Sequence, residues 1–386
     1  MFRHSKFTKY IYIASFCFGL QGALAAYINS TYLANFIPEV WIGLIFSVGA
    51  FCALCMLALA PRIIRNIGNR QYALLFLVVN LFALFFIGQG SGPILIIGAF
   101  IAYIATNSAI MYAFDLFIEH VNPIPSETGR MRGIYLTVLN IAWMFAPLIS
   151  GYILAHYGFT MLYGLSMVFV LCTFLFLGSK LRGYKNPVYK TISFSRGIRA
   201  LLANKNLRNI ASVNFILQLF YSWMIVFMPV YLVKHLGFSW EDVGIMFTIM
   251  LAAFVILQYP LGRLADTNLG EKELLISGLC VMGLACLLVP FFAGATLIAW
   301  AGLLFLSRVG AATIESMAEI YFFKQIGERD TSMLSTYRLT SPTAFIIGPL
   351  VGSAILFFSS YGTLFFILGI VVLSGLYYAI KLKDTR

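Results

Sequence analysis

Three charged side chains occur inside one otherwise apolar stretch of the chain, at positions 301–324. Glu315 and Glu319 follow Arg308 by 7 and 11 residues. A helix of 3.6 residues per turn returns nearly to the same angle after these offsets, so the three charges form one stripe roughly 40° wide. A charge inside a membrane helix is costly and rarely faces lipid. Arg308 is therefore a candidate to contact an anionic or polar substrate, or to neutralise a carboxylate and tie helices together.

The carboxylates on two helices could carry a proton or close a gate. At about 1.5 Å per residue, Arg308 lies roughly 18 Å into its helix, near the midplane, and both glutamates lie nearer the cytoplasmic end. Asp115 shares a helix face with Ser108 and Met111. We interpret Asp115 and Glu315 as proton carriers or gate residues. Burial favours the neutral carboxyl and a nearby arginine favours the charged one, so both roles stay open.

Gate residues are also expected where acids end their helices. Glu119 follows Asp115 by one turn, and Glu319 follows Glu315. At a helix end an acid can pair with arginines of the connecting segments, so we interpret both as gating residues. On the expected first and seventh helices, Asn29, Gln218 and Trp223 are expected to line a substrate cavity, although each alone is equally typical of helix packing.

The composition defines the broad class of protein. Hydrophobic residues make up 61% of the 386 residues and charged residues 10%, whereas a soluble domain has about 45–50% apolar and about 25% charged residues. Because a spanning helix needs about 20 apolar residues, we expect an all-α polytopic membrane protein with twelve transmembrane helices. They are placed near residues 10–34, 41–60, 72–88, 94–119, 133–156, 160–179, 209–233, 241–261, 274–292, 296–323, 339–358 and 363–381.

Several kinds of chemistry have no support in the sequence. No G-x-x-x-x-G-K-[ST] loop occurs, so ATP hydrolysis is not expected. No pair of histidines has zinc-ligand spacing, and no nucleophile–base set stands out. We expect no enzyme, no metal site and no cofactor. Energy for transport would come from a gradient, with the proton gradient favoured.

Basic residues lie in alternate connecting segments. The chain carries a net charge of +12. The distribution of its basic residues follows the positive-inside rule, which predicts that both termini are cytoplasmic in a cell membrane. The segment Lys180–Arg208 holds eight basic residues and no acid. Its part Phe194–Ala203 is amphipathic and is expected to lie on an anionic leaflet. The partner of the charge is thus the lipid bilayer and not a nucleic acid.

An internal repeat divides the chain. A shift of 202 positions places Tyr135 on Tyr337 and Pro147 on Pro349. The prolines are flanked by small residues, which allow membrane helices to approach closely. We therefore expect two six-helix bundles, at residues 1–182 and 209–386, joined by a basic cytoplasmic linker at 183–208. Parallel repeats of this kind are typical of transporters with a midplane site.

Two patterns resemble those of the major facilitator superfamily. The segment Gly262–Lys272 resembles its loop signature G-x-L-A-D-R-x-G-R-R, with matches at Gly262, Leu264, Ala265, Asp266 and Gly270. The first-half copy, Pro61–Arg70, has no acid at the aspartate position. Around the fifth span, the small residues near Pro147 resemble the antiporter signature of the superfamily. The resemblance implies that Asp266, Gly262, Gly270, Pro147 and Pro349 act in gating or conformational change.

This resemblance implies a secondary active transporter that moves a small molecule by alternating access. Proton-linked export, or antiport, is favoured because of the fifth-span pattern. A proton-coupled uptake symporter for a sugar or small metabolite is the alternative. A non-transporting membrane receptor or sensor on a transporter scaffold is the alternative of another class. We expect a monomer.

Overall fold

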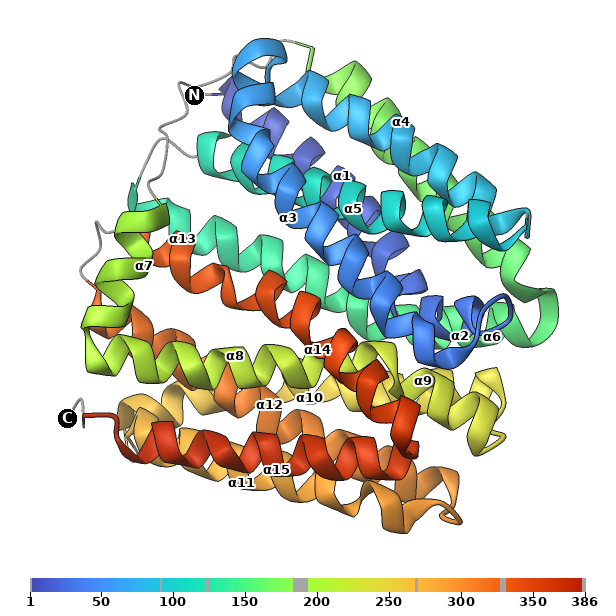
Figure 1. Cartoon of the computed structure of the whole chain (residues 1–386). Coiled ribbons are helices and arrows are strands. Elements are labelled where there is room, and N and C mark those ends of the chain that lie inside the picture. Colours follow the sequence, from blue (N-terminus) through green and yellow to red (C-terminus); the bar gives the residue numbers. More distant parts are fainter. Residues whose placement is uncertain are drawn as a thin grey trace. The chain divides into compact units, whose positions relative to one another are not determined.

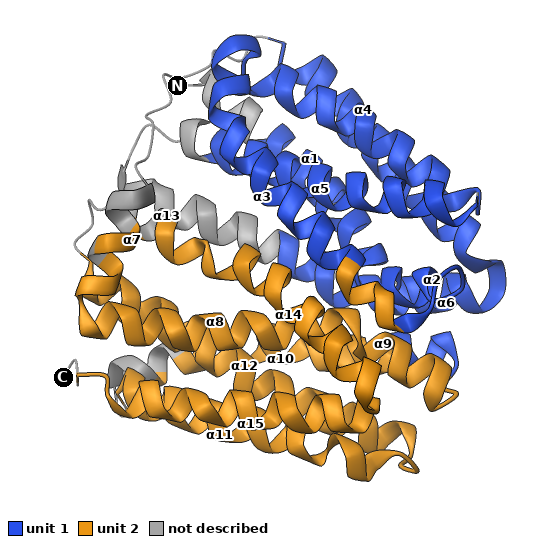
Figure 2. Ribbon diagram, viewed as in Figure 1, with its two compact units in different colours: residues 1–39, 45–191, 239–244 blue, residues 40–44, 192–238, 245–386 orange. Residues whose placement is uncertain are grey.

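The computed structural model describes residues 2–90, 92–121, 125–182, 194–267, 270–326 and 331–383, with some of the helical residues described by their backbone alone. Every element among these residues is a helix (Figure 1). The expectation of an all-α membrane protein is confirmed. The chain forms two compact units, coloured separately in Figure 2.

Unit 1 comprises residues 1–39, 45–191 and 239–244. Its helices are α1 (Phe2–Ala26), α2 (Asn29–Leu33), most of α3 (Ile42–Ile67), α4 (Asn69–Gly88), α5 (Pro93–Val121) and α6 (Pro125–Lys180). The first turn of α10 (Trp240–Thr267) also belongs to it.

Unit 2 comprises residues 40–44, 192–238 and 245–386. It holds the first residues of α3 and the rest of α10. Its other helices are α7 (Phe194–Ala203), α8 (Lys205–Val226), α9 (Met228–Val230), the π-helical turn η2 (Tyr231–His235), α11 (Glu271–Leu288), the 3-10 turn η3 (Val289–Phe292), α12 (Leu297–Gln325), α13 (Thr331–Arg338), α14 (Thr340–Phe358) and α15 (Tyr361–Ile380). The 3-10 turn η1 (Glu39–Trp41) precedes α3.

Ten helical stretches in the described part of the chain are long and apolar enough to cross a membrane. One of them, at Leu139–Lys180, covers two of the predicted spans. They are separated at Gly158, whose φ of 76° and ψ of −176° are not helical. Two further spans, predicted as single helices, are interrupted: α1 ends before α2, and α8 ends before α9, where Pro229 removes a backbone donor.

The internal repeat is visible in the helix packing of each unit. In unit 1, α4 packs on α5 and α6, and α1 packs on α5 and α6. In unit 2, the corresponding helix α11 packs on α12 and α15, and α8 packs on α12, α14 and α15. Figure 1 shows α11, α12 and α15 as neighbours. Each unit therefore builds the same arrangement from its own half of the sequence.

A basic residue near the start of the third helix of each repeat binds the end of the last helix. Arg70 donates from Nε to the carbonyl of Leu177 at 3.1 Å and from Nη2 to that of Gly178 at 2.6 Å. Lys272, 202 positions later, donates from Nζ to the carbonyl of Leu382 at 3.0 Å. Leu177 and Gly178 lie in the last turn of α6, where carbonyls have no partners within the helix and carry partial negative charge, so a cation there is stabilising. Leu382 follows the last residue of α15, Ile380, and Lys272 binds the chain just beyond that helix.

We predict that Gly158→Ala destabilises the protein by about 1–2 kcal/mol, because an L side chain at positive φ meets its own backbone. No atom lies within 4 Å of the added Cβ, so the penalty comes from conformation alone. The matched control is Gly164→Ala, in the same helix α6, equally open around the added Cβ and without a positive φ. Thermal unfolding in detergent should show a lower Tm for the first variant and an unchanged or higher Tm for the second. Equal Tm values would contradict the prediction.

Candidate functional site

The three charged side chains predicted to form a stripe lie on α12, and they become more exposed from Arg308 towards Glu319. The Arg308 side chain is only 2% exposed, Glu315 is half-buried, and Glu319 is exposed. Arg308 is the twelfth residue of this helix, about 17 Å from its first residue. A nearly fully buried cation near the centre of a membrane helix requires compensating interactions.

Two aromatic rings of α8 supply part of this compensation. The guanidinium carbon Cζ of Arg308 lies 5.1 Å from the ring centroid of Phe220 and 5.2 Å from that of Tyr221. The electron-rich ring faces attract a cation, and for a desolvated pair each contact contributes up to about 2 kcal/mol. Neither aromatic residue was singled out from the sequence. The sequence did offer one signal for them, because they are two consecutive aromatic residues close to Gln218 on the seventh span.

Tyr221 also joins the cation to the carboxylate. Its hydroxyl donates to Oε2 of Glu315 at 2.6 Å, and Glu315 interacts electrostatically with both Arg308 and Glu319. The ring of Tyr221 thus contacts Arg308 while its hydroxyl holds Glu315. The structure brings together two of the predicted residues and adds the aromatic residue between them. We call Arg308, Phe220, Tyr221 and Glu315 the arginine–tyrosine–glutamate cluster.

Close contact between α11 and α12 positions Arg308. A Cβ added at Gly310, two residues beyond it, would lie 2.6 Å from the carbonyl oxygen of Gly278 and 2.6 Å from the amide nitrogen of Met282. Only glycine allows this approach without a shift of the backbone. The glycine near the arginine therefore has a packing role that holds one face of α12 against α11.

The other residues predicted to line a cavity have different surroundings. Trp223 is 1% exposed, and its Nε1 donates to the carbonyl of Gly348 at 2.6 Å, so it joins α8 to α14. Gln218, on the same helix, is half-buried. Asn29 belongs to unit 1, is 5% exposed, and accepts a hydrogen bond from the Tyr163 hydroxyl at 2.9 Å.

The remaining predicted acids and glycines take no part in the contacts that the structure describes for this cluster, or they lie outside the described residues. Asp115, in unit 1, is exposed, and Ser108 and Met111 on the same face of α5 are half-buried. The side chains of Glu119 and Asp266, and the surroundings of Gly262, lie outside the described residues. Gly270 is buried and caps the start of α11 with φ −70° and ψ 161°.

The two repeat-related prolines contact glycines. In unit 1, a Cβ added at Gly244 in the first turn of α10 would lie 2.7 Å from the carbonyl oxygen of Pro147. In unit 2, a Cβ added at Gly43 would meet the carbonyl oxygen of Pro349, and the amide of Gly43 donates to Ser353 Oγ at 3.0 Å. Small residues around both prolines therefore serve close helix packing.

A buried amide network lies in unit 1. Gln21 of α1 donates from Nε2 to Oδ1 of Asn107 at 2.8 Å, and Asn80 of α4 donates from Nδ2 to the same oxygen at 3.4 Å and to Thr106 Oγ1 at 2.9 Å. The hydroxyl of Tyr103 donates to Gln21 Oε1 at 3.4 Å. We call these five residues the amide cluster. Asn80, Tyr103 and Asn107 were not predicted from the sequence as site residues.

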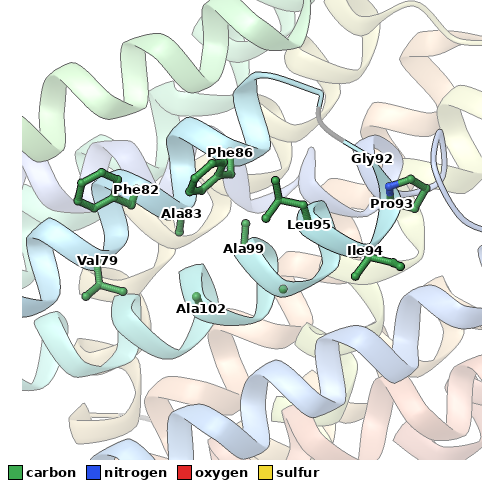
Figure 3. Close-up of a pocket in the computed structure, with 11 residues that line it drawn as sticks. Val79, Phe82, Ala83, Phe86, Gly92, Pro93, Ile94, Leu95, Ala99 and Ala102 are labelled. Carbon is green, nitrogen blue, oxygen red and sulfur yellow. The ribbon is translucent and has the colours of Figure 1, made fainter.

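A cavity of about 620 Å³ in unit 1 is of a different kind (Figure 3). It lies between α4 and α5, where Phe82 and Phe86 on one helix approach Leu95 and Ala99 on the other. All of its lining residues are apolar or glycine. A cavity without polar groups cannot recognise a polar solute, so it is not the candidate site.

Comparison with known proteins identifies the family of this protein. The family model described as Major Facilitator Superfamily matches residues 11–240 and 210–386. The chain belongs to the major facilitator superfamily. It is a multi-pass membrane protein and a secondary transporter, and the resemblance predicted from the loop signature is confirmed.

Solved structures support the same fold at low sequence identity. A mutant form of the nucleoside transporter NupG is 12% identical with a TM-score of 0.78, covering 97% of this chain and 99% of that one. A bacterial metal transporter is 14% identical with a TM-score of 0.70, covering 98% and 99%. No match was found among curated proteins.

We predict that Tyr221→Leu lowers the thermal stability of the protein more than Tyr221→Phe does. Phenylalanine keeps the ring beside Arg308 and loses only the hydroxyl bond to Glu315, whereas leucine loses both contacts. A single neutral-to-charged hydrogen bond contributes about 1.5–3 kcal/mol, and the cation–ring contact up to about 2 kcal/mol more. The Tm in detergent should fall in the order wild type, Phe variant, Leu variant. A Leu variant as stable as the Phe variant would show that the ring does not stabilise Arg308.

Proposed function

We propose that this protein is a proton-linked exporter, in which the arginine–tyrosine–glutamate cluster binds substrate and proton. The observation that supports this is the burial of Arg308 between two rings, with the half-buried Glu315 held by the same tyrosine. Buried charge in a membrane helix marks substrate or ion pathways. A cation and a titratable acid that both contact one side chain are suited to coupling substrate binding to proton binding.

The substrate class follows from the chemistry of Arg308. A guanidinium is always charged and presents several N–H donors in a planar fork, so it suits carboxylates, phosphates and other strong acceptors. Substrates with an anionic or strongly accepting group are therefore favoured. The similar solved structures are those of a nucleoside transporter and a bacterial metal transporter. No group of three or more His, Cys, Asp or Glu that could hold a metal occurs in the described part of the chain, which does not favour a metal cargo.

Glu315 is the proposed proton carrier. When its carboxyl is charged, it partly neutralises the field of Arg308, and when it is protonated, the net charge of the cluster rises by one. A bound anionic group is then attracted more strongly, so its binding and protonation favour each other, which is the linkage that a symporter needs. Export by antiport requires the opposite linkage, in which the substrate also donates to the charged carboxylate of Glu315 and so competes with the proton. Glu319 lies on the same stripe but is exposed, so its charge is screened and it serves gating instead.

The direction of transport rests on the fifth-span pattern, which resembles that of antiporters. Besides the sign of the linkage at Glu315, one contact favours the alternative of proton-coupled uptake. The same contact between a proline carbonyl and a glycine occurs at Pro147 and at Pro349, so the pattern serves packing in both repeats. Because a shared packing motif is not specific to export, uptake symport is the second candidate.

The further parts of the proposal follow from the sequence. The basic segments place both termini in the cytoplasm, and the two repeats work by alternating access as a monomer. Asp115 and Glu119 are proposed at the cytoplasmic end of α5, where they pair with basic residues.

We predict that Glu315→Gln abolishes proton coupling, while Glu319→Gln leaves it nearly unchanged. Purified protein in proteoliposomes with a trapped pH-sensitive dye is given uridine, glucose, lactate and tetraphenylphosphonium in turn. A substrate of the wild-type protein changes the internal pH, and the direction of that change separates antiport from symport. Glutamine keeps the shape of Glu315 but cannot release a proton, so the pH change should disappear. A Glu315→Gln protein that still moves protons with substrate would contradict the assignment.

We further predict that Arg308→Ala reduces substrate flux at least tenfold, because a charge-assisted contact to substrate contributes about 1.5–3 kcal/mol. Arg308→Lys should be intermediate, because it keeps the charge but not the planar fork. Uptake of radiolabelled substrate by proteoliposomes is the measurement, with Tm as the control for folding. Full flux in a folded Arg308→Ala protein would show that this cluster is not the substrate site.

A further inference from the structure

The apolar cavity of unit 1 runs along two neighbouring spans. Both α4 and α5 are apolar helices long enough to cross a membrane, and they pack on each other. On α4, the lining residues Val79, Phe82, Ala83 and Phe86 recur every three or four positions, so they share one face of the helix. On α5, the lining extends over residues 92–102. The cavity is therefore a groove between two helices, which we call the α4–α5 groove (Figure 3).

The walls of this groove are large side chains, and its inner side is made of small ones. Phe82 is 59% exposed, and Leu95 on the facing helix is also exposed. The buried Ala83 and Ala99 line the inner side. Gly98 leaves open space, because a Cβ added there would meet nothing within 4 Å. Since exposed apolar side chains of a spanning helix contact the hydrocarbon of the bilayer, the groove is continuous with the lipid-facing surface of unit 1.

Water and polar solutes are poor occupants of the α4–α5 groove. All of its lining residues are apolar or glycine, and an apolar cavity without hydrogen-bond partners stays dry. An empty groove is also unfavourable, because lining atoms without neighbours lose dispersion contacts of about 0.1–0.2 kcal/mol per atom pair. In a membrane, the material available to fill it is the hydrocarbon of the lipids.

The dimensions of the groove match one acyl chain. From Pro93 to Ala102, the lining extends about 14 Å along α5, which is nearly half of a hydrocarbon core of about 30 Å and thus the depth of one leaflet. The volume is about 620 Å³. A helix about 10 Å wide would occupy roughly 1,100 Å³ over the same length, so a helix of a second copy would not enter the groove.

We propose that the α4–α5 groove is a binding site for one acyl chain of a membrane lipid. The groove begins at Gly92 and Pro93, at the end where α4 is followed by α5. The lipid headgroup therefore lies at the membrane surface near this end, and the chain terminus lies between Val79 and Ala102. In the proposed orientation, this leaflet is the outer one. The site lies within unit 1 and goes beyond the proposed transport function, because it involves no residue of the substrate cluster.

The forces available in a bilayer explain how the chain is held. Lipid tails are as apolar as the protein surface, so no hydrophobic effect favours their association, and close packing must supply the affinity. The rings of Phe82 and Phe86 and the side chain of Leu95 offer contacts on both sides of a chain that lies over Gly98. A chain in the groove contacts two helices at once, whereas a chain on a flat helix face contacts one.

The contrasting interpretation is transient contact with the bilayer, which is the same for every lipid-facing surface. Gly302 on α12 provides the comparison. It is exposed, and a Cβ added there would also meet nothing within 4 Å, but it does not line the groove. A bound chain is distinguished from transient contact by enrichment at the groove, by order along its length, and by loss when the groove is filled.

The test is photolabelling of the purified full-length protein in vesicles of phosphatidylethanolamine and phosphatidylglycerol. A trace of phosphatidylcholine carries a diazirine either at the end of one acyl chain or close to its headgroup, and labelled peptides are identified by mass spectrometry. Gly98→Leu fills the groove, and leucine is a better helix former than glycine. Phe82→Ala removes one exposed wall. The matched control is Gly302→Leu, and Tm checks the folding of each variant.

We expect the chain-end probe to label peptides around Val79 and Ala102, and the headgroup-end probe to label those around Pro93. Gly98→Leu should reduce labelling of the groove about tenfold, because the side chain takes the place of the acyl chain and its packing contacts. Phe82→Ala should reduce it less, and Gly302→Leu should leave it within about twofold.

Equal labelling of the groove in wild-type and folded Gly98→Leu protein would overturn the proposal. Labelling spread evenly over all spans would do the same, since it would indicate transient contact alone. If Gly98→Leu does not fold, the comparison of Phe82→Ala with Gly302→Leu decides. A covalent dimer joined at α4 or α5 after irradiation would show that a second copy covers the groove, which also contradicts an acyl chain as its occupant.

Discussion

The cost of burying one positive charge in a membrane helix shapes unit 2. Arg308 is nearly fully buried on α12, and translocon scales assign about 2.5–3.5 kcal/mol to such a residue at the centre of a span. The rings of Phe220 and Tyr221 and the nearby carboxylate of Glu315 offset this cost. Since these partners come from α8 and α12, the contact between the two helices is held at one separation. A ligand that competes for Arg308 would change that contact.

The two units accommodate polar side chains near the centres of their helices in different ways. Unit 2 pairs a cation with aromatic rings and an acid, whereas unit 1 joins amides and hydroxyls among α1, α4 and α5. Both arrangements arise on equivalent helices of the repeat. Duplication explains the shared packing, and divergence at a few positions, such as Thr106 against Arg308, explains the different chemistry.

Contacts at the ends of the helices stabilise each unit without involving the polar residues near the helix centres. Arg70 binds carbonyls in the last turn of α6, and Lys272 binds the carbonyl of Leu382 just beyond α15. In unit 2, the buried Glu271 also pairs with Lys324 at the end of α12. These contacts lie near the membrane surface, where a charge costs less than at the centre. Each bundle is thereby braced at one end by contacts that are separate from its central polar residues.

Much of this protein is determined by the sequence alone. Apolar runs of about 20 residues define the spans because backbone groups in lipid must be satisfied within a helix. The period of 3.6 residues predicted that Arg308, Glu315 and Glu319 share one face of α12, and their decreasing burial is seen in the structure. Only the tertiary structure decided the partners. Tyr221 between Arg308 and Glu315, Trp223 as a packing residue and the amides around Asn107 depend on contacts between helices far apart in sequence. Helical periodicity specifies which face a side chain occupies, but the neighbour on that face is set by how the helices pack.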